Sequence, residues 1–163
     1  MSDALNDAVQ KQLFFDARTF NKFQPRPVDD ATLHALVDLM KWAPTSMNAQ
    51  PARIVFVRSA AAKEKLKPAL MGGNVDKTMA APVTAIVAYD TEFHEQLPTQ
   101  FPALPGARDM FHGNAPFIES TAFRNSSMQG AYLIVAARTL GLDVGAMSGF
   151  NNAAVDAAFF PEG

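Results

Sequence analysis

The sequence predicts a single mixed α/β domain in which a small sheet is flanked by helices. Its length of 163 residues suits one domain, and because no repeat or linker divides the chain, residues 1–163 are treated as one domain. Apolar residues recur with a helical period in several segments, and short apolar runs typical of strands lie between them. This alternation of helical and strand-like patterns indicates an α/β architecture.

The composition excludes several classes of protein. A hydrophobic content of 48% with 18% charged residues is typical of a globular chain. The net charge of -2 gives no electrostatic reason to expect a nucleic-acid partner. The chain has no cysteine, which excludes disulfides and is compatible with a reducing cytoplasm. The acidic N-terminus lacks an apolar signal core, and no window reaches the roughly 20 apolar residues of a membrane span, so we expect a cytoplasmic protein without a membrane partner.

Two helices are predicted before the first strand. Between Asp3 and Phe15 the apolar residues fall at helical spacing, namely at Leu5, Val9, Leu13 and Phe14. Pro25 and Pro27 then favour an extended chain. Asp29 or Asp30 is expected to cap a second helix, whose buried face consists of Leu33, Leu36, Val37 and Met40.

The segment from Trp42 to Pro51 separates this helix from the first strand. A plain connector needs only about two to six residues, whereas this one is longer and holds hydroxyl and amide side chains between two prolines. Pro44 and Pro51 lower the entropic cost of keeping one loop shape, so the polar side chains between them can point at a ligand. The same residue types are ordinary turn formers, and a segment that only caps and turns is the alternative.

The middle of the chain predicts two strands around a helix. Residues 53–58 form the first strand and residues 60–70 a helix with a charged, solvated face. Gly72 and Gly73 are expected to end that helix, and a short segment leads to the second strand at residues 83–89. This strand is apolar almost throughout, which predicts that both of its faces are buried.

The last part of the chain begins with an irregular segment at residues 91–117, rich in proline and phenylalanine. Such segments are often lids or binding loops. A long helix is predicted from Glu119 to Leu140, a third strand at residues 142–147, and a final helix from Asn151 or Asn152 to Phe160. Three strands make a thin sheet for so many helices, so we expect a further segment, such as another strand, after Gly163.

The sequence offers neither a metal site nor a nucleophile motif. His34, His94 and His112 do not pair with one another, or with a carboxylate, at the spacing of a metal-binding helix, so no metal site is predicted. Phosphate loops, dinucleotide-binding glycine motifs and the hydrolase serine elbow are also missing from the sequence. A protein without its own reactive group usually uses that of a cofactor.

Scattered polar residues indicate what such a cofactor carries. Arg18 with Thr19 offers a guanidinium and a hydroxyl, which suit a phosphate. Asn74 and Lys77 are three residues apart and can place an amide and an ammonium on one helical turn. The turn at residues 148–149 follows a predicted strand, where α/β sheets place ligands. Each pattern is also compatible with ordinary surface polarity, but together they predict a phosphate-bearing, partly aromatic ligand.

Several segments, taken in chain order, resemble those of the nitroreductase family of FMN enzymes. The resemblance is carried by Arg18–Phe23, by the Ala-Pro-Thr-Ser-x-Asn-x-Gln-Pro loop at residues 43–51, by Asn74 with Lys77, and by Gly145–Phe150. The loop is the most specific of these signals. Within the family, residues 123–127 together with residues 147–150 resemble the RutE-type malonic semialdehyde reductases.

The resemblance implies a nitroreductase-like fold with a small central mixed sheet and an intertwined homodimer that binds FMN at its interface. It also implies a set of flavin contacts. On one subunit, Arg18, Thr19 and Asn21 would hold the phosphate and ribityl end, Asn74 and Lys77 would face the isoalloxazine ring, and Ser148 and Gly149 would lie near its N5 atom. From the other subunit, Pro44, Thr45, Ser46 and Asn48 would reach the same flavin.

The implied activity is a ping-pong hydride transfer in which NADPH or NADH reduces FMN and an acceptor then reoxidises it. For the branch resembled, the acceptor is malonic semialdehyde, reduced to 3-hydroxypropanoate during pyrimidine breakdown, and Arg124 would anchor its carboxylate. If the acceptor is instead a nitroaromatic or a quinone, a flatter pocket walled by Phe111 or Phe117 is expected. A flavin-binding protein without useful turnover is the alternative from another class.

Two positions depart from the family pattern. Ala17 stands where a second basic residue is common, and Asn21 stands where arginine or lysine is common. The phosphate charge must therefore be met by other groups. In the family a C-terminal segment supplies such basic residues and adds a strand to the partner's sheet, and both would lie beyond Gly163.

Overall fold

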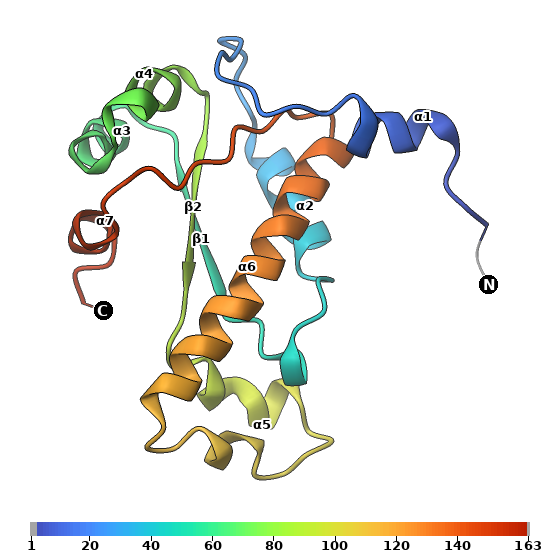
Figure 1. Cartoon of the computed structure of the whole chain (residues 1–163), viewed down its shortest axis with the longest axis vertical. Coiled ribbons are helices and arrows are strands. Elements are labelled where there is room, and N and C mark those ends of the chain that lie inside the picture. Colours follow the sequence, from blue (N-terminus) through green and yellow to red (C-terminus); the bar gives the residue numbers. More distant parts are fainter. Residues whose placement is uncertain (1–2, 163) are drawn as a thin grey trace. The chain divides into compact units, whose positions relative to one another are not determined.

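The computed structural model describes residues 3–162 as a mixed α/β chain (Figure 1). The helices are α1 (Asp7–Gln10), α2 (Asp30–Met40), α3 (Ala60–Leu66), α4 (Gly72–Ala80), α5 (Leu97–Gln100), α6 (Ala115–Thr139) and α7 (Asn152–Phe159). The strands are β1 (Ala52–Val57) and β2 (Thr84–Tyr89). A π-helical turn at Lys11–Phe15 continues α1, and 3₁₀ turns lie at Ser46–Asn48, Lys67–Ala69, Phe93–Gln96 and Ala107–Met110. Between residues 3 and 162, no helix combines the length and the apolarity that crossing a membrane requires.

The chain divides into two compact units. The first unit holds the described parts of Met1–Asp29, Phe56–Ala85 and Leu142–Gly163, and the second holds Asp30–Val55 and Ile86–Gly141. β1 and β2 form the sheet and contribute residues to both units. The backbone N–H of Asp90 donates to Pro51 O at 2.9 Å, which puts the end of β2 beside the start of β1, so the pair is antiparallel.

The second unit is built around the long helix α6, against which α2 packs (Figure 1). The predicted apolar stripe of α2 is confirmed, since Leu33, Leu36 and Met40 are buried. At the N-terminal end of α6, a separate core cluster joins the short helical turns to the helix. It consists of Ala49, Phe93, Leu97, Ala107, Phe111 and Ala122. Phe93, Leu97 and Phe111 have no exposed surface, so this cluster fixes the backbone of the segment that precedes α6.

The first unit packs α3, α4 and α7 around the first-unit ends of the two strands (Figure 1). Asn151 caps α7 as predicted, because its side-chain oxygen accepts a hydrogen bond from Ala154 N at 3.0 Å. α3 and α7 are in contact, and the Lys65 ammonium lies 5.1 Å from the centre of the Phe159 ring, a cation–π distance.

Three expectations about helix boundaries are wrong. Helix α3 ends at Leu66, and the break falls at Leu70 and Met71, whose backbones are extended, whereas Gly72 and Gly73 open helix α4. The irregular segment before α6 contains short helices and 3₁₀ turns over residues 93–100 and 107–110. Helix α6 begins at Ala115, because the Asn114 side chain caps it and the proline at residue 116 is tolerated in a first turn.

The expectations about strands also need correction. Residues 142–147 form no strand, and their only ladder contact among the described residues is a single parallel bridge between Val144 and Thr19. β2 is not buried on both faces, since half-buried and exposed side chains alternate along it, and Val87 and Tyr89 are 43% and 36% exposed. Successive side chains of a strand point to opposite faces, and only one face of β2 is covered by its own chain.

Lys63 shows how a charge is accommodated inside the first unit. The residue is 8% exposed, and its ammonium donates to Met79 O at 3.2 Å and to Ala81 O, the last carbonyls of helix α4. A cation at a helix C-terminus satisfies carbonyls that have no partner within the helix. Burial lowers the pKa of Lys63 below its usual value of 10.5.

Replacing this lysine tests that arrangement. Lys63→Met leaves two buried carbonyls without a donor, so we expect the free energy of unfolding to fall by about 1–3 kcal/mol. Because the unfolded chain keeps its Lys63 proton up to pH 10.5 and the folded chain releases it earlier, stability from this residue rises with pH in the window just below 10.5. Urea unfolding at neutral pH and near pH 10 checks both points, with the exposed Lys67→Met as the control.

Candidate functional site

In the first unit, the three predicted ligand-binding segments lie against one another. Thr19 pairs with Val144, and Phe20 N donates to Val144 O at 3.2 Å. Asn74 Nδ2 donates to Gly149 O at 2.8 Å. These contacts connect residues 18–21, 74–77 and 144–149 into one surface, which we term the first-unit site; its predicted ligand-binding side chains are Arg18, Thr19, Asn21, Asn74, Lys77, Ser148 and Gly149.

Two glycines permit these close approaches. A Cβ on Gly149 would lie 2.6 Å from Asn74 Nδ2, which donates to the same glycine's carbonyl. A Cβ on Gly145 would collide with the backbone carbonyl oxygen of Phe20. Glycine is therefore required at both positions for a reason of space, and the Gly-x-x-x-Gly spacing recorded in the sequence is a packing requirement of this site.

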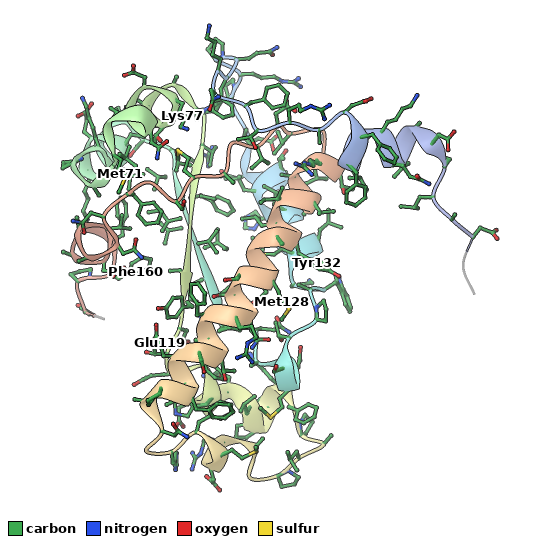
Figure 2. The ribbon with its side chains drawn as sticks, in the orientation of Figure 1. Met71, Lys77, Glu119, Met128, Tyr132 and Phe160 are labelled. Carbon is green, nitrogen blue, oxygen red and sulfur yellow. The ribbon has the colours of Figure 1, made fainter. Side chains whose placement is uncertain are left out.

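Lys77 supplies the positive charge at the centre of the first-unit site. It is half-buried on helix α4 (Figure 2), and its ammonium lies 3.5 Å from Asn21 Oδ1. This hydrogen bond is long, and an ammonium has three donors, so Lys77 keeps donor capacity for a ligand. The structure thus brings Asn21 and Lys77 together although 55 residues separate them in the sequence.

Arg18 is exposed at the edge of the same site. Its Nη1 atom donates to Phe15 O at 2.7 Å and to Ala17 O at 2.8 Å, so the side chain is folded back on its own turn. A guanidinium carries five N–H donors in a planar fork, and these two bonds use only one of its nitrogens. Ser148 is exposed beside Gly149, and its hydroxyl is accessible to a ligand.

In the second unit, the predicted loop at residues 43–51 adopts a backbone that is rare for residues with side chains. Met47, Asn48 and Gln50 have φ angles of 53°, 51° and 41°, all in the left-handed region. A non-glycine residue in this region costs about 1–3 kcal/mol and persists only when its surroundings hold it there. Strain of this kind concentrates at ligand-binding sites, which favours the ligand-binding interpretation of the loop over the simple turn.

The loop's own polar side chains account for part of this restraint. Thr45 Oγ1 accepts a hydrogen bond from Gln50 N at 3.2 Å, and Gln50 Nε2 donates to Asn48 Oδ1 at 2.7 Å. Asn48 Nδ2 in turn donates to Gln100 O at 3.0 Å. Thr45 and Asn48 therefore shape the loop, while Pro44 and Ser46 are exposed on it.

Two residues that the sequence analysis missed hold the loop from outside. Asn125 and Gln129 lie one turn apart on α6 and are 0% and 2% exposed. Asn125 Oδ1 accepts a hydrogen bond from Ser46 N at 2.8 Å, and Gln129 Oε1 accepts one from Ala52 N at 2.9 Å. The sequence does contain a signal for them, because two amides at four-residue spacing interrupt a buried helix face whose other residues are small or apolar.

The three residues predicted to contact a substrate differ in their exposure. Arg124 is exposed on α6, next to the buried Asn125. Phe117 is 37% exposed and stacks on Phe111 with ring centres 4.8 Å apart. Phe111 itself is fully buried in the core cluster, so it supports Phe117 from behind and presents no surface of its own to a ligand.

The second unit also contains a cavity of about 280 Å³. It is lined by Pro98, Phe101, Pro102, Leu104, Pro105 and Arg108, among others. Small-molecule sites usually measure about 300–1,000 Å³, so this cavity falls just below their range. It contains none of the predicted site residues.

Comparison with known proteins decides the family. The sequence profile described as Nitroreductase family matches residues 16–160, which covers the first-unit site and the loop. The chain belongs to the nitroreductase family. Two relatives carry the provisional name NADH dehydrogenase/NAD(P)H nitroreductase. The protein from Burkholderia lata is 64% identical over 156 residues, covering 96% of this chain and 80% of its own. That from Rhodopseudomonas palustris is 57% identical over 166 residues, covering 100% and 83%.

Solved structures show the same nitroreductase fold. A provisionally assigned nitroreductase from Exiguobacterium sibiricum, crystallised in complex with FMN, superposes with a TM-score of 0.82 and 17% identity over 98% of this chain and 82% of its own. A gut-bacterial enone reductase of fatty acid saturation gives a TM-score of 0.80 and 21% identity, over 95% and 81%. These identities are low, so the structural likeness establishes the fold and its small sheet between helices.

Proposed function

We propose that this nitroreductase-family protein is an FMN-dependent NAD(P)H oxidoreductase. The observation that carries the proposal is the first-unit site, where separate segments meet to present an ammonium, an amide, hydroxyls and a guanidinium. Lys77 offers a cation to a ring that becomes negative, Arg18 and Thr19 offer donors to a phosphate, and Gly149 lets the Asn74 amide pack against the turn. This donor set fits FMN in character, and the names and bound cofactor of the related proteins agree with it.

The residues act by position and charge. Bound FMN supplies the ring that carries hydride from NADPH or NADH to the acceptor. The Lys77 ammonium stabilises the negative charge of the reduced ring, and the amide of Asn74 and the backbone around Gly149 fix the ring's orientation. NAD(P)H is held in the cytoplasm, so we place the reaction there.

We propose further that the chain works as a homodimer. Helix α6 carries exposed apolar side chains on two sides: Met128 and Tyr132, 39% and 43% exposed, lie one turn apart (Figure 2), and Phe123, 61% exposed, lies on the other side. Phe123 contacts Tyr89 of β2 edge to face at 6.2 Å. Apolar surface of this kind usually marks an interface, and a second copy of the chain would bury the same face on both subunits. The loop of each subunit then reaches the partner's flavin through Pro44, Thr45, Ser46 and Asn48.

The double variant Met128→Glu, Tyr132→Glu tests the dimer. Two carboxylates on this face would lose their hydration in the interface, so we expect a monomer that also loses FMN. Size-exclusion chromatography with light scattering gives the mass, and the flavin absorbance gives the cofactor content. Lys67→Glu, in the 3₁₀ turn after α3, adds a comparable negative charge elsewhere and should leave both unchanged. A double variant that stays dimeric with full flavin would place the interface on another surface.

For the acceptor we propose malonic semialdehyde, with hydride added to its aldehyde carbon and a proton to its oxygen to give 3-hydroxypropanoate in pyrimidine breakdown. The motif at residues 123–127 supports this choice, and so does Arg124, whose exposed guanidinium can bind a carboxylate through two hydrogen bonds. The alternative, a nitroaromatic or a quinone, would need a broad aromatic wall. Of the two phenylalanines considered for it, only Phe117 has exposed surface.

A substrate panel tests the proposed function. The FMN-loaded protein is given NADPH or NADH with malonic semialdehyde, a nitroaromatic or a quinone, and nucleotide consumption is followed. We expect the aldehyde to be the best acceptor and Arg124→Ala to raise its KM without affecting the nitroaromatic. A preference for the nitroaromatic, unaffected by Arg124→Ala, would favour the alternative acceptor. Yellow protein that no acceptor reoxidises faster than oxygen would support a flavin-binding role without turnover.

A further inference from the structure

His94, Glu95 and His112 converge in the second unit, although the sequence spacing gave no reason to expect it. His94 Nε2 lies 3.5 Å from Glu95 Oε1, and His112 Nε2 lies 3.8 Å from the same oxygen. One ligand atom from each of the three residues lies within 4.8 Å of the others. Two imidazoles and one carboxylate thus face a common point, which we term the His–Glu cluster.

The backbone under this cluster is fixed by the core. Phe93 and Phe111 each precede one of the histidines, both are fully buried, and their rings pack edge to face at 5.1 Å. The two histidines are therefore held at a set separation by their buried neighbours. Both aromatic anchors belong to the second unit, as do the three residues of the cluster.

The hydrogen bonding of His94 is incomplete within the protein. The residue is 9% exposed, and its Nδ1 atom is buried without a hydrogen-bond partner. Its Nε2 atom lies 3.5 Å from Glu95, at the outer limit of a hydrogen bond. The long contact at Nε2 leaves this nitrogen, which faces Glu95, available to a cation, whereas Nδ1 points away from the cluster and would not touch the same ion.

The surrounding charges favour a cation. Arg108 Nη1 lies 3.3 Å from Glu95 Oε2, which engages one carboxylate oxygen and leaves Oε1 toward the histidines. Asp109 Oδ1 lies 3.9 Å from His112 Nδ1. At this distance the carboxylate adds negative charge beside the ring but is too far for a hydrogen bond to it. With neutral imidazoles, the two carboxylates and one guanidinium leave the site negatively charged.

We propose that His94, Glu95 and His112 bind a divalent transition-metal ion of the zinc type, with water completing the coordination. Nitrogen and carboxylate ligands suit zinc, nickel, cobalt and copper, whereas magnesium and calcium prefer oxygen ligands alone. Ligand atoms on a tetrahedral ion lie about 3.3 Å apart at bond lengths of about 2.0 Å. Two of the pairs here are within a few tenths of an ångström of that value, and rotation of the half-exposed His112 ring closes the third. The ion joins the turn at Phe93–Gln96 to His112, which follows the turn at Ala107–Met110, independently of the flavin reaction.

The composition of the chain makes the test sharp. It has three histidines and no cysteine, so His34, which is exposed on α2, is a matched control. Tag-free, chelator-treated protein is titrated with Zn²⁺ in a calorimeter, and Co²⁺ is followed by its visible absorption. We expect one ion per chain, affinity lowered at least about tenfold by His112→Ala, His94→Gln or Glu95→Gln, and no change from His34→Ala or on adding excess Mg²⁺.

A second measurement distinguishes loss of metal binding from misfolding of a variant. In proton NMR spectra the imidazole signals of His94 and His112 should shift together on adding Zn²⁺, while that of His34 should not. Circular dichroism would check that the exposed His112→Ala variant is folded. No Zn²⁺ binding to the wild type, or binding that survives His112→Ala and His94→Gln but is lost in His34→Ala, would overturn the proposal.

Discussion

Lys77→Ala is expected to slow flavin reduction by NADPH by about 10²–10³-fold, the usual effect of removing one group that stabilises developing charge. FMN retention should fall by much less, because we propose that Arg18, Thr19, Asn74 and the loop also bind the cofactor. The difference arises because the Lys77 ammonium interacts more strongly with the negative reduced ring than with the neutral oxidised ring. Anaerobic stopped-flow absorbance gives the reduction rate, and fluorescence of released FMN gives the affinity.

Lys67→Ala serves as the control, since Lys67 is exposed in the same unit and pairs with Glu64 at 3.5 Å. It should change neither quantity. Equal losses of reduction rate and of FMN affinity in Lys77→Ala would mean that this lysine only binds the cofactor. Lys77→Arg should recover part of the rate, because it restores the positive charge.

Asn125→Leu is expected to distort the loop at residues 43–51, although residue 125 would not itself contact a ligand. Leucine has the same number and branching of side-chain heavy atoms as asparagine but no acceptor for Ser46 N, and leaving such a group unpaired costs about 1–3 kcal/mol in unfolding free energy. The left-handed residues Met47 and Asn48 would relax once this anchor is lost, which misplaces the loop. We expect steady-state activity to fall at least tenfold and FMN to bind more weakly.

A rescue distinguishes loop positioning from a general loss of stability. Glycine adopts the left-handed conformation without strain, so Met47→Gly in the Asn125→Leu background should recover part of the activity. It should not restore the unfolding free energy measured in urea. Thr139→Ala, which removes an exposed hydrogen bond of the same helix, is the control and should behave as wild type. If activity falls in proportion to the unfolding free energy across all these variants, Asn125 has no separate role in positioning the loop.

Much of the fold could be predicted from local patterns. The stripe of α2, the capping asparagine of α7 and the position of β1 depend on side-chain periodicity and capping, which are local properties. Residues 142–147 show the limit of such reasoning. Their apolar pattern is that of a strand, but a strand also needs a partner along its length, and Val144 finds one only at Thr19.

The candidate site was predicted as residue types but not as contacts. The pairing of Asn21 with Lys77 and the clearance at Gly149 connect residues far apart in the sequence, so only the folded chain reveals them. Asn125 and Gln129 were missed because a buried amide on a helix is usually a packing detail, and its partner on the loop cannot be read from spacing. The His–Glu cluster was missed for the same reason, since buried phenylalanines set its geometry.

The central claim is that this chain supplies both halves of a flavin site, one to its own FMN and one to that of a second copy. Sedimentation of the FMN-loaded protein, followed at the flavin absorbance and at the protein absorbance, tests it most directly. The claim predicts that the flavin sediments with twice the mass of one chain, at one FMN per chain. Flavin that sediments with a single chain, or that stays free beside a colourless protein in excess FMN, would contradict it.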